Sequence, residues 1–270
     1  MLNRRSLVLG APACLLCGCS GALHRLPAVD AGQMGLAVAE IGGGAMPPRR
    51  ILTEREVLDT LEAARDRLQG PAAGVCREIG TGVCTWQVRA VRDRTPNAYA
   101  TGDGLIVIHR GVVEYAQSED EVAFVIAHEM AHHAANHVRQ SRRNTTTGAV
   151  IGAILLGGLA AAAGAGGGTY ARAATRDATT LGARAGAGLG RISFSKEQER
   201  EADYLAAVTL HRAGYDLSKA RNFLVTLGRA SSRRETGLLD THPAGPERLA
   251  AWDRAVAEIG VSKGRLPSRA

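Results

Sequence analysis

The pattern HEMAH at residues 128–132 constrains the fold more than any other part of this 270-residue chain. Residues four apart on an α-helix differ by about 40° around its axis, so the imidazoles of His128 and His132 face one way and can bind one Zn²⁺. Glu129 lies beside them, close enough to hold a water molecule at the metal. The pattern therefore requires a helix, which we predict over residues 118–140.

Two further histidines follow closely, and helical geometry separates them from this pair. His133 and His137 lie roughly 140° and 180° from His128 around the axis. They are themselves four residues apart, so a second metal site is conceivable, but that face carries no carboxylate. We therefore expect both side chains to pack or to face solvent. The rest of the helix is apolar nearly all round, which predicts a central, buried position.

A catalytic zinc ion needs a third protein ligand and keeps one position for water. A third histidine ten residues after the first would define a metzincin, but this position is Val138, so that class is excluded. The alternative ligand is a carboxylate from a second helix. The sequence predicts such a helix over residues 195–214, where Glu197, Glu199 and Glu201 are the candidates.

Glu199 is the best of these candidates, and Glu201 is second. One turn after Glu199 stands Asp203, which can accept the spare N–H of a zinc-bound histidine while Glu199 binds the metal. Glu197 and Glu201 point to other sides of the helix and are expected to be solvated. The sequence therefore predicts one zinc ion per chain, held by two imidazoles and one carboxylate from two separate helices.

Capping boxes and apolar periodicity place the other elements. They predict an α+β fold that is mostly helical, with a small β-sheet. The helices are expected at 53–68, 118–140, 195–214, 218–229 and after the segment THPAGP, and the strands at 84–91 and 104–111.

The N-terminus has the features of an export signal, with basic residues before an apolar run too short to span a bilayer. It ends in LCGC (16–19), which resembles the lipobox of bacterial lipoproteins with Cys19 as the acylated residue. An ordinary cleaved signal with a chance cysteine is the alternative. We expect a signal peptide over 1–18, a lipidated flexible tether over 19–50, and a periplasmic location, anchored to the outer membrane.

Export also decides the interpretation of the two remaining cysteines. Cys76 and Cys84 would meet an oxidising compartment, so a disulfide between them is expected. A metal-binding pair is the competing interpretation, but no histidine or further cysteine stands near them in the sequence.

The basic charge is concentrated in one segment, since residues 139–191 hold seven arginines and one acid. A nucleic-acid binder would carry its basic residues on folded elements with aromatics between them, and export argues against such a partner, so anionic lipid is the more natural contact. Within this segment, residues 148–168 are apolar, uncharged and rich in Gly and Ala. They are long enough to span a membrane, but we favour a helical hairpin packed on the main body. Membrane contact through residues 148–190 is the other possibility.

Three segments in order, HEMAH, FSKEQEREADYLA (194–206) and THPAGPERL (241–249), resemble the HtpX-like and CAAX-prenyl-protease-like zinc metallopeptidases, a gluzincin family. The resemblance covers about residues 53–255 and is greatest to the stand-alone, lipid-anchored periplasmic branch. It implies a zincin-like fold with a small sheet packed on the metal-binding helix. The implied domain runs from 51 to 262, with an insertion at 144–190 and a tail at 263–270.

The resemblance also implies roles for single residues. It implies His128, His132 and Glu199 as zinc ligands, Glu129 as catalytic acid and base, and Asp203 as the acid that orients a ligand. His242 of the THP motif would lie by the active site, either steadying the oxyanion or occupying the open metal position. The positions matching the family's remaining site residues are Arg248, Asn97 and Ala98.

The expected function is that of a zinc-dependent endopeptidase acting on unfolded or misassembled envelope proteins, with Glu129 activating a zinc-bound water. The polypeptide substrate is expected to pair as an added strand along Leu105, Ile106 and Val107. A chaperone-like assembly factor for outer-membrane proteins that binds rather than cleaves is one alternative, although the intact Glu129 argues against it. A membrane-structural lipoprotein is another, but it leaves the zinc motif unexplained.

Overall fold

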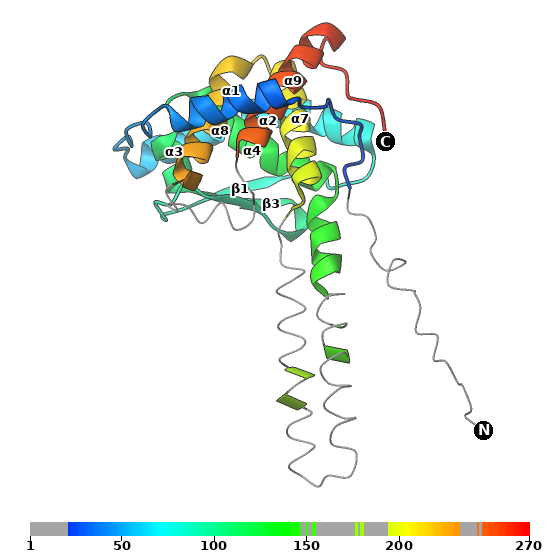
Figure 1. The fold of residues 1–270 in the computed structure, drawn as a ribbon. Coiled ribbons are helices and arrows are strands. Elements are labelled where there is room, and N and C mark those ends of the chain that lie inside the picture. The colour runs from blue at the N-terminus through cyan, green and yellow to red at the C-terminus, as the bar shows by residue number, and fades with distance from the viewer. Residues whose placement is uncertain are drawn as a thin grey trace, which may run out of the picture.

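The computed structural model describes residues 21–146, 150, 153–154, 176–177, 179–180, 194–232, 242 and 245–270. Its elements form a mostly helical body with one small mixed sheet (Figure 1), which confirms the expected fold class. In chain order the elements are α1 (Ala31–Gly42), α2 (Glu54–Ile79), β1 (Gln87–Val91), β2 (Ala98–Ala100), the 3₁₀ turn η1 (Gly102–Gly104), β3 (Leu105–His109), α3 (Arg110–Tyr115), α4 (Glu119–Ala134), α7 (Lys196–Arg212), α8 (Leu217–Ser232) and α9 (Pro246–Ser262).

Helix α2 is longer than the predicted helix at 53–68, since it continues to Ile79. Its capping box at Thr53 is present as expected. The helix passes through Pro71 and continues because its buried apolar stripe continues beyond the proline. It ends at Gly80, whose φ of 71° is the left-handed conformation that glycine adopts without strain.

The three strands pair in the order β1-β3-β2, with β3 in the centre. Strand β1 runs parallel to β3, and β2, which the sequence analysis did not predict, runs antiparallel to it. Both edges of β3 are therefore occupied, so Leu105, Ile106 and Val107 cannot pair with a substrate strand, and this prediction is corrected. Within the described residues, β2 pairs on one edge only.

Helix α4 forms the centre of the body and packs against α2, α7 and α8. Every residue from Glu121 to Ala134 is buried, which is why the helix is apolar nearly all round. It ends before the predicted end at residue 140, because Asn136 adopts the left-handed conformation with φ 63°. The backbone is helical again over 137–146, so two helical segments replace the single predicted one.

The segment expected to be a flexible tether contributes helix α1 to the folded body. Asp30 caps α1 through a complete capping box, and the helix lies along α9 and α8 (Figure 1). The close approach to α8 depends on Gly228, because an added Cβ there would lie 2.7 Å from Cδ1 of Ile41. The surrounding Gly- and Pro-rich composition hid this short helix from the sequence analysis.

Several predictions concern residues outside the described part of the chain. The signal peptide at 1–18 and the lipidation site Cys19 lie there, as does nearly all of 148–168. Among the helices that the structure describes, none has the length and apolar character needed to cross a membrane.

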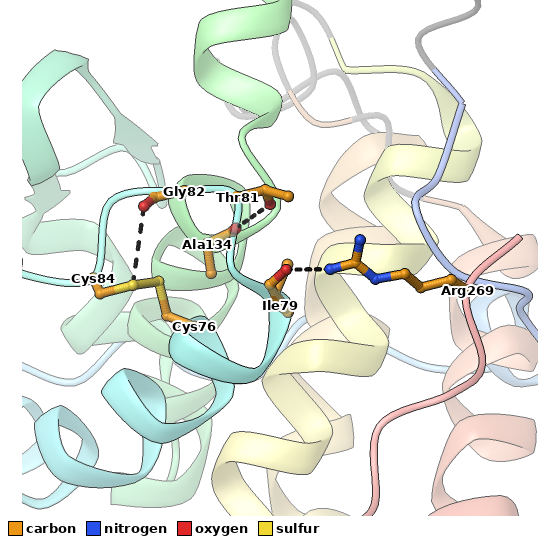
Figure 2. The surroundings of a disulfide bond; sticks show 7 residues. All are labelled: Cys76, Ile79, Thr81, Gly82, Cys84, Ala134 and Arg269. Carbon is orange, nitrogen blue, oxygen red and sulfur yellow. Dashed lines mark hydrogen bonds between the residues drawn. A yellow bond between two sulfur atoms is a disulfide. The ribbon is translucent and has the colours of Figure 1, made fainter.

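A disulfide joins Cys76, near the end of α2, to Cys84, ahead of β1, with the two Cα atoms 5.5 Å apart. Figure 2 shows the turn that this bond closes, where the Thr81 hydroxyl donates to the carbonyl oxygen of Ala134 at 3.1 Å. Gly82 in this turn leaves no room for a side chain, because an added Cβ would lie 1.9 Å from a backbone oxygen of α4. The turn therefore packs against the C-terminal end of the helix that carries the HEMAH motif.

Candidate metal centre

Helices α4 and α7 bring three of the predicted ligands to one buried point. Nε2 of His128 lies 3.1 Å from Nε2 of His132. The carboxylate of Glu199 lies beside both nitrogens, with Oε2 3.5 Å from Nε2 of His128 and Oε1 3.4 Å from Nε2 of His132. His242, just ahead of α9, adds Nδ1, which lies 2.9 Å from Oε1 of Glu199 and 3.3 Å from Nε2 of His128. One ligand atom from each of the four residues lies within 4.8 Å of the others, and we call this set the metal group.

The spacing of these atoms matches a tetrahedral zinc site. Four ligand atoms about 2.0–2.1 Å from a zinc ion lie about 3.3 Å from one another. Five of the six residue pairs in the metal group have a separation between 2.9 and 3.5 Å when either oxygen of Glu199 is counted, and all four ligand atoms lie within 4.8 Å of one another. Three imidazoles and one carboxylate are also a donor set that zinc accepts. The residues present therefore fit the ion that the motif implies.

Glu129 lies beside the metal group, where the sequence analysis placed it. Its side chain is buried, with Oε1 3.5 Å from Nε2 of His242. The second oxygen, Oε2, has no hydrogen-bond partner in the described structure. This oxygen is therefore free to accept a hydrogen bond from a molecule bound beside the metal group. Glu129 and His242 share a recess with apolar walls that include Phe124 and Phe223.

Asp203 lies behind the metal group, next to His128, as predicted. Its Oδ1 is 2.9 Å from Nδ1 of that ring, the nitrogen that faces away from the metal group. Arg248, on α9, donates to the same carboxylate from Nε at 2.8 Å and from Nη2 at 2.7 Å. Its Nη1 lies 2.7 Å from Oε2 of Glu199. One buried guanidinium therefore fixes both the acid in the metal group and the acid behind it.

The electrostatics of the site keep two of the three predicted ligands, Glu199 and His132, in the protonation state that a metal ligand needs. Burial opposes the charged form of Glu199, but His242 and Arg248 outweigh it and hold the pKa of the carboxyl well below its usual value. Burial lowers the pKa of His132 well below 6.5, so this ring keeps a free lone pair. Burial acts likewise on His128, but Asp203 and Glu199 outweigh it and raise its pKa to about 9. A metal ion that binds here must therefore displace a proton.

The predicted substrate residues divide between two strands. Asn97 precedes β2 and Ala98 begins it, whereas Leu105, Ile106 and Val107 lie on the central β3. Ala100, at the end of β2, packs in a small apolar cluster with Val138 and Phe194. The ring of Phe194 stacks on His132, with ring centroids 3.8 Å apart. This stacking places the end of β2 next to the metal group.

Some residues around the site were missed or misplaced by the sequence analysis. His137 and Glu201 are buried and contact each other; His137 was expected to pack or to face solvent, whereas Glu201 was expected to be solvated. Phe194 was not considered, although its position just before the cap of α7 was visible. His24 was assigned to a tether, and no local pattern marks it as a contact of Glu201, which lies 177 residues away.

Comparisons with known proteins agree with this geometry. The family model described as "Peptidase family M48" matches residues 62–256. The putative beta-barrel assembly-enhancing protease of Vibrio cholerae is 35% identical over 162 residues, which are 59% of this chain and 32% of that protein. The mitochondrial metalloendopeptidase OMA1 of Arabidopsis thaliana is 27% identical over 219 residues, 81% of this chain and 41% of that protein. The chain thus spans about a third to two fifths of the length of these relatives.

Proposed function

Because the chain belongs to peptidase family M48, a family of gluzincin metallopeptidases, we propose that it is a zinc-dependent endopeptidase. The observation that carries this proposal is the buried metal group with the unpartnered carboxylate oxygen of Glu129 beside it. We assign one zinc ion per chain to His128, His132 and Glu199, with His242 at the fourth corner.

Glu129 is the group that moves protons in the proposed reaction. A zinc ion bound to the metal group would polarise a peptide carbonyl and make a water molecule more acidic. Glu129 accepts a proton from the attacking water and delivers it to the leaving amine. His242 lies 3.5 Å from Glu129, so after giving up the fourth corner it can donate a hydrogen bond to the oxygen of the substrate carbonyl.

We propose that the substrate pairs with β2 instead of β3. Strand β2 has one edge unpaired among the described residues, and its end packs next to the metal group through Phe194. An extended peptide added to this edge would be bound mainly through its backbone. Such binding suits unfolded polypeptides, so we assign unfolded or misassembled envelope proteins as the substrate class. The name of the Vibrio cholerae relative, an assembly-enhancing protease, supports this choice.

The proposed location follows from the N-terminal sequence. The lipobox-like LCGC and the disulfide at Cys76 both suit an exported protein. We propose a periplasmic enzyme, lipidated at Cys19 and anchored to the outer membrane. Labelling of the expressed chain with a fatty-acid analogue, compared with Cys19→Ser, tests the anchor, and equal labelling of the two would remove it.

Glu129→Gln in the purified mature chain tests the proposed activity. We expect at least about a hundredfold loss of cleavage of unfolded casein, with bound zinc retained, because the amide cannot accept the proton. The control is Glu62→Gln on the exposed face of α2, which should cleave at the wild-type rate. Equal cleavage by wild type and Glu129→Gln would contradict the proposal. A wild-type chain that prevents aggregation of unfolded outer-membrane proteins without cutting them would favour the chaperone-like alternative.

A further inference from the structure

Behind the metal group, a line of buried polar side chains continues from His132. Nδ1 of His132 lies 3.1 Å from Nδ1 of His137. Nε2 of His137 lies 3.0 Å from Oε2 of Glu201. All three side chains are fully buried. His137 thus contacts one residue of the metal group, and Glu201 is connected to that residue through His137.

The left-handed turn at Asn136 creates this connection. In an unbroken helix His137 would point away from the face that carries His128 and His132. With φ 63° at Asn136, the chain turns after α4, and the ring of His137 lies against His132. Asparagine is among the few residues that adopt this conformation readily. The break in the helix therefore has a local cause and a consequence at the metal group.

The other end of the line is held by the N-terminal segment. Oε2 of Glu201 accepts from the backbone N–H of Leu23 at 2.9 Å, and Oε1 accepts from that of His24 at 3.0 Å. Nδ1 of His24 lies 2.5 Å from Oε1. A buried carboxylate with four nitrogen contacts is held in one orientation.

The C-terminal residues fix this N-terminal segment in turn. The N–H of Arg25 donates to the carbonyl of Ser268 at 2.9 Å, and the N–H of Ala270 donates to the carbonyl of Leu23 at 3.0 Å. Arg269, between them, reaches the carbonyl of Ile79 at the end of α2, as Figure 2 shows. Leu23 and His24 therefore belong to a paired, anchored segment.

When Glu201 is ionised and the rings of His137 and His132 are neutral, only one set of ring tautomers gives each contact along the line one donor and one acceptor. A carboxylate accepts and cannot donate, so Nε2 of His137 carries the hydrogen that faces Glu201. Nδ1 of His137 then has a lone pair and accepts from Nδ1–H of His132. Nε2 of His132 is left without a hydrogen, and this is the atom that lies 3.4 Å from Glu199 in the metal group.

Metal-binding histidines usually donate their second N–H to a carboxylate, a carbonyl or water, which sets the tautomer and the ring plane. His128 has Asp203 for this purpose, at 2.9 Å. Among the described residues no acid lies that close to His132, and its Nδ1 contacts His137 instead. The carboxylate that completes the arrangement for His132 is Glu201, one ring further away.

We propose that Glu201 is a positioning residue of the metal site, acting on His132 through His137, and that Leu23 and His24 hold its carboxylate in place. The inference rests on the metal site of the proposed function. It makes the N-terminal segment a part of the metal site, although no residue of that segment touches the metal group.

The zinc affinity of the purified mature chain, measured by competition with a chromophoric chelator, tests this inference. We expect Glu201→Gln to bind Zn²⁺ about 10–100-fold more weakly than wild type, because the amide can present an N–H where His137 needs an acceptor. His137→Gln should weaken binding by a similar factor. The absorption bands of the Co²⁺-substituted protein should shift in both variants, since they report ligand geometry rather than folding.

Two control variants match these changes. Glu197→Gln alters an exposed acid on the same helix, and His133→Gln alters a buried histidine that lies next to a metal ligand in sequence but outside the line. Both should bind Zn²⁺ within about twofold of wild type and leave the Co²⁺ bands unchanged. Equal affinity and equal bands for Glu201→Gln, His137→Gln and wild type would overturn the proposal.

His24 variants keep the test decisive if a change at Glu201 prevents folding. His24→Ala removes one donor from the N-terminal segment, and we expect a several-fold loss of Zn²⁺ affinity that His24→Asn, whose amide can donate, partly restores. Unchanged affinity in folded His24→Ala would count against the role of the segment. A wild-type chain that binds Zn²⁺ but does not cleave casein would refute only the proposed function, because these affinities are measured without substrate.

Discussion

Arg248 donates two hydrogen bonds to Asp203, from Nε at 2.8 Å and from Nη2 at 2.7 Å, and both side chains are buried. The pair connects α9 to α7 directly behind His128. Its guanidinium also lies 2.7 Å from Glu199, so one cation balances two buried acids. The pair therefore matters to the fold and to the metal group together.

Replacement of Arg248 is expected to destabilise the metal-free protein strongly. Arg248→Met leaves Asp203 and Glu199 without a cation, and breaking a buried pair in this way costs about 3–5 kcal/mol. Arg248→Lys keeps the charge but loses the bidentate geometry, so we expect a smaller loss. Urea unfolding in the presence of a chelator measures both. The exposed Arg254→Met on the same helix is the control, and equal stability of the two Met variants would contradict the role of Arg248.

Proline at the free edge of β2 should separate substrate binding from folding. The bonds from His109 N–H to Asn97 O and from Thr101 N–H to Leu105 O show that residues 97 and 101 face β3. Orientation alternates along an antiparallel strand, so the N–H of Ala98 points to the free edge and that of Tyr99 points to β3. Ala98→Pro therefore removes a donor for the substrate without removing a hydrogen bond to β3.

We expect Ala98→Pro to raise KM for unfolded casein about tenfold and, although Ala98 is buried, to lower the urea midpoint less than Tyr99→Pro does. The matched variant Tyr99→Pro removes a bond within the sheet and should mainly lower stability. Unchanged KM in a folded Ala98→Pro protein would argue against substrate pairing at β2.

Glu121, near the start of α4, is expected to make stability depend on pH. Burial is the main cause that raises the pKa of its carboxyl from 4.5 to about 7. Since the pKa is higher in the folded state, the protonated carboxyl of Glu121 contributes fully to the free energy of unfolding below pH 4.5. This contribution is lost as the pH rises through 7. The side chain of Glu121→Gln cannot ionise. The free energy of unfolding of this variant, relative to that of wild type, should therefore rise by roughly 2 kcal/mol from pH 4 to pH 8. Urea unfolding at both pH values measures this, and a constant difference would contradict it.

The disulfide between Cys76 and Cys84 should stabilise the chain by about 2–3 kcal/mol, because it closes a short loop in the unfolded state. The variant with serine at both positions should unfold at lower urea concentration by that amount. Wild type treated with a reductant should match it, and the reductant should not affect the double variant. A wild-type protein insensitive to reduction would show that the bond does not form in solution.

The sequence alone determined what depends on neighbours within one or two turns of helix. His128 and His132 had to share a face because their spacing is close to one helical turn, and the capping boxes at Thr53 and Ser195 marked the helix starts for the same local reason. The prediction of one unbroken helix to residue 140 was wrong, because a single residue, Asn136, adopts the left-handed conformation and ends α4.

Tertiary structure alone decided which distant groups meet. Sequence spacing ranked Glu201 as an alternative ligand or a solvated acid, yet its partners His137 and His24 lie 64 and 177 residues away. Likewise, residues 104–111 are readily recognised as a strand, but only pairing with β1 and β2 made β3 central and left the unpaired edges of the described sheet to β1 and β2. Local preferences carry no information on such long-range pairing, because its energy comes from burial and hydrogen bonds that exist only once the chain has folded.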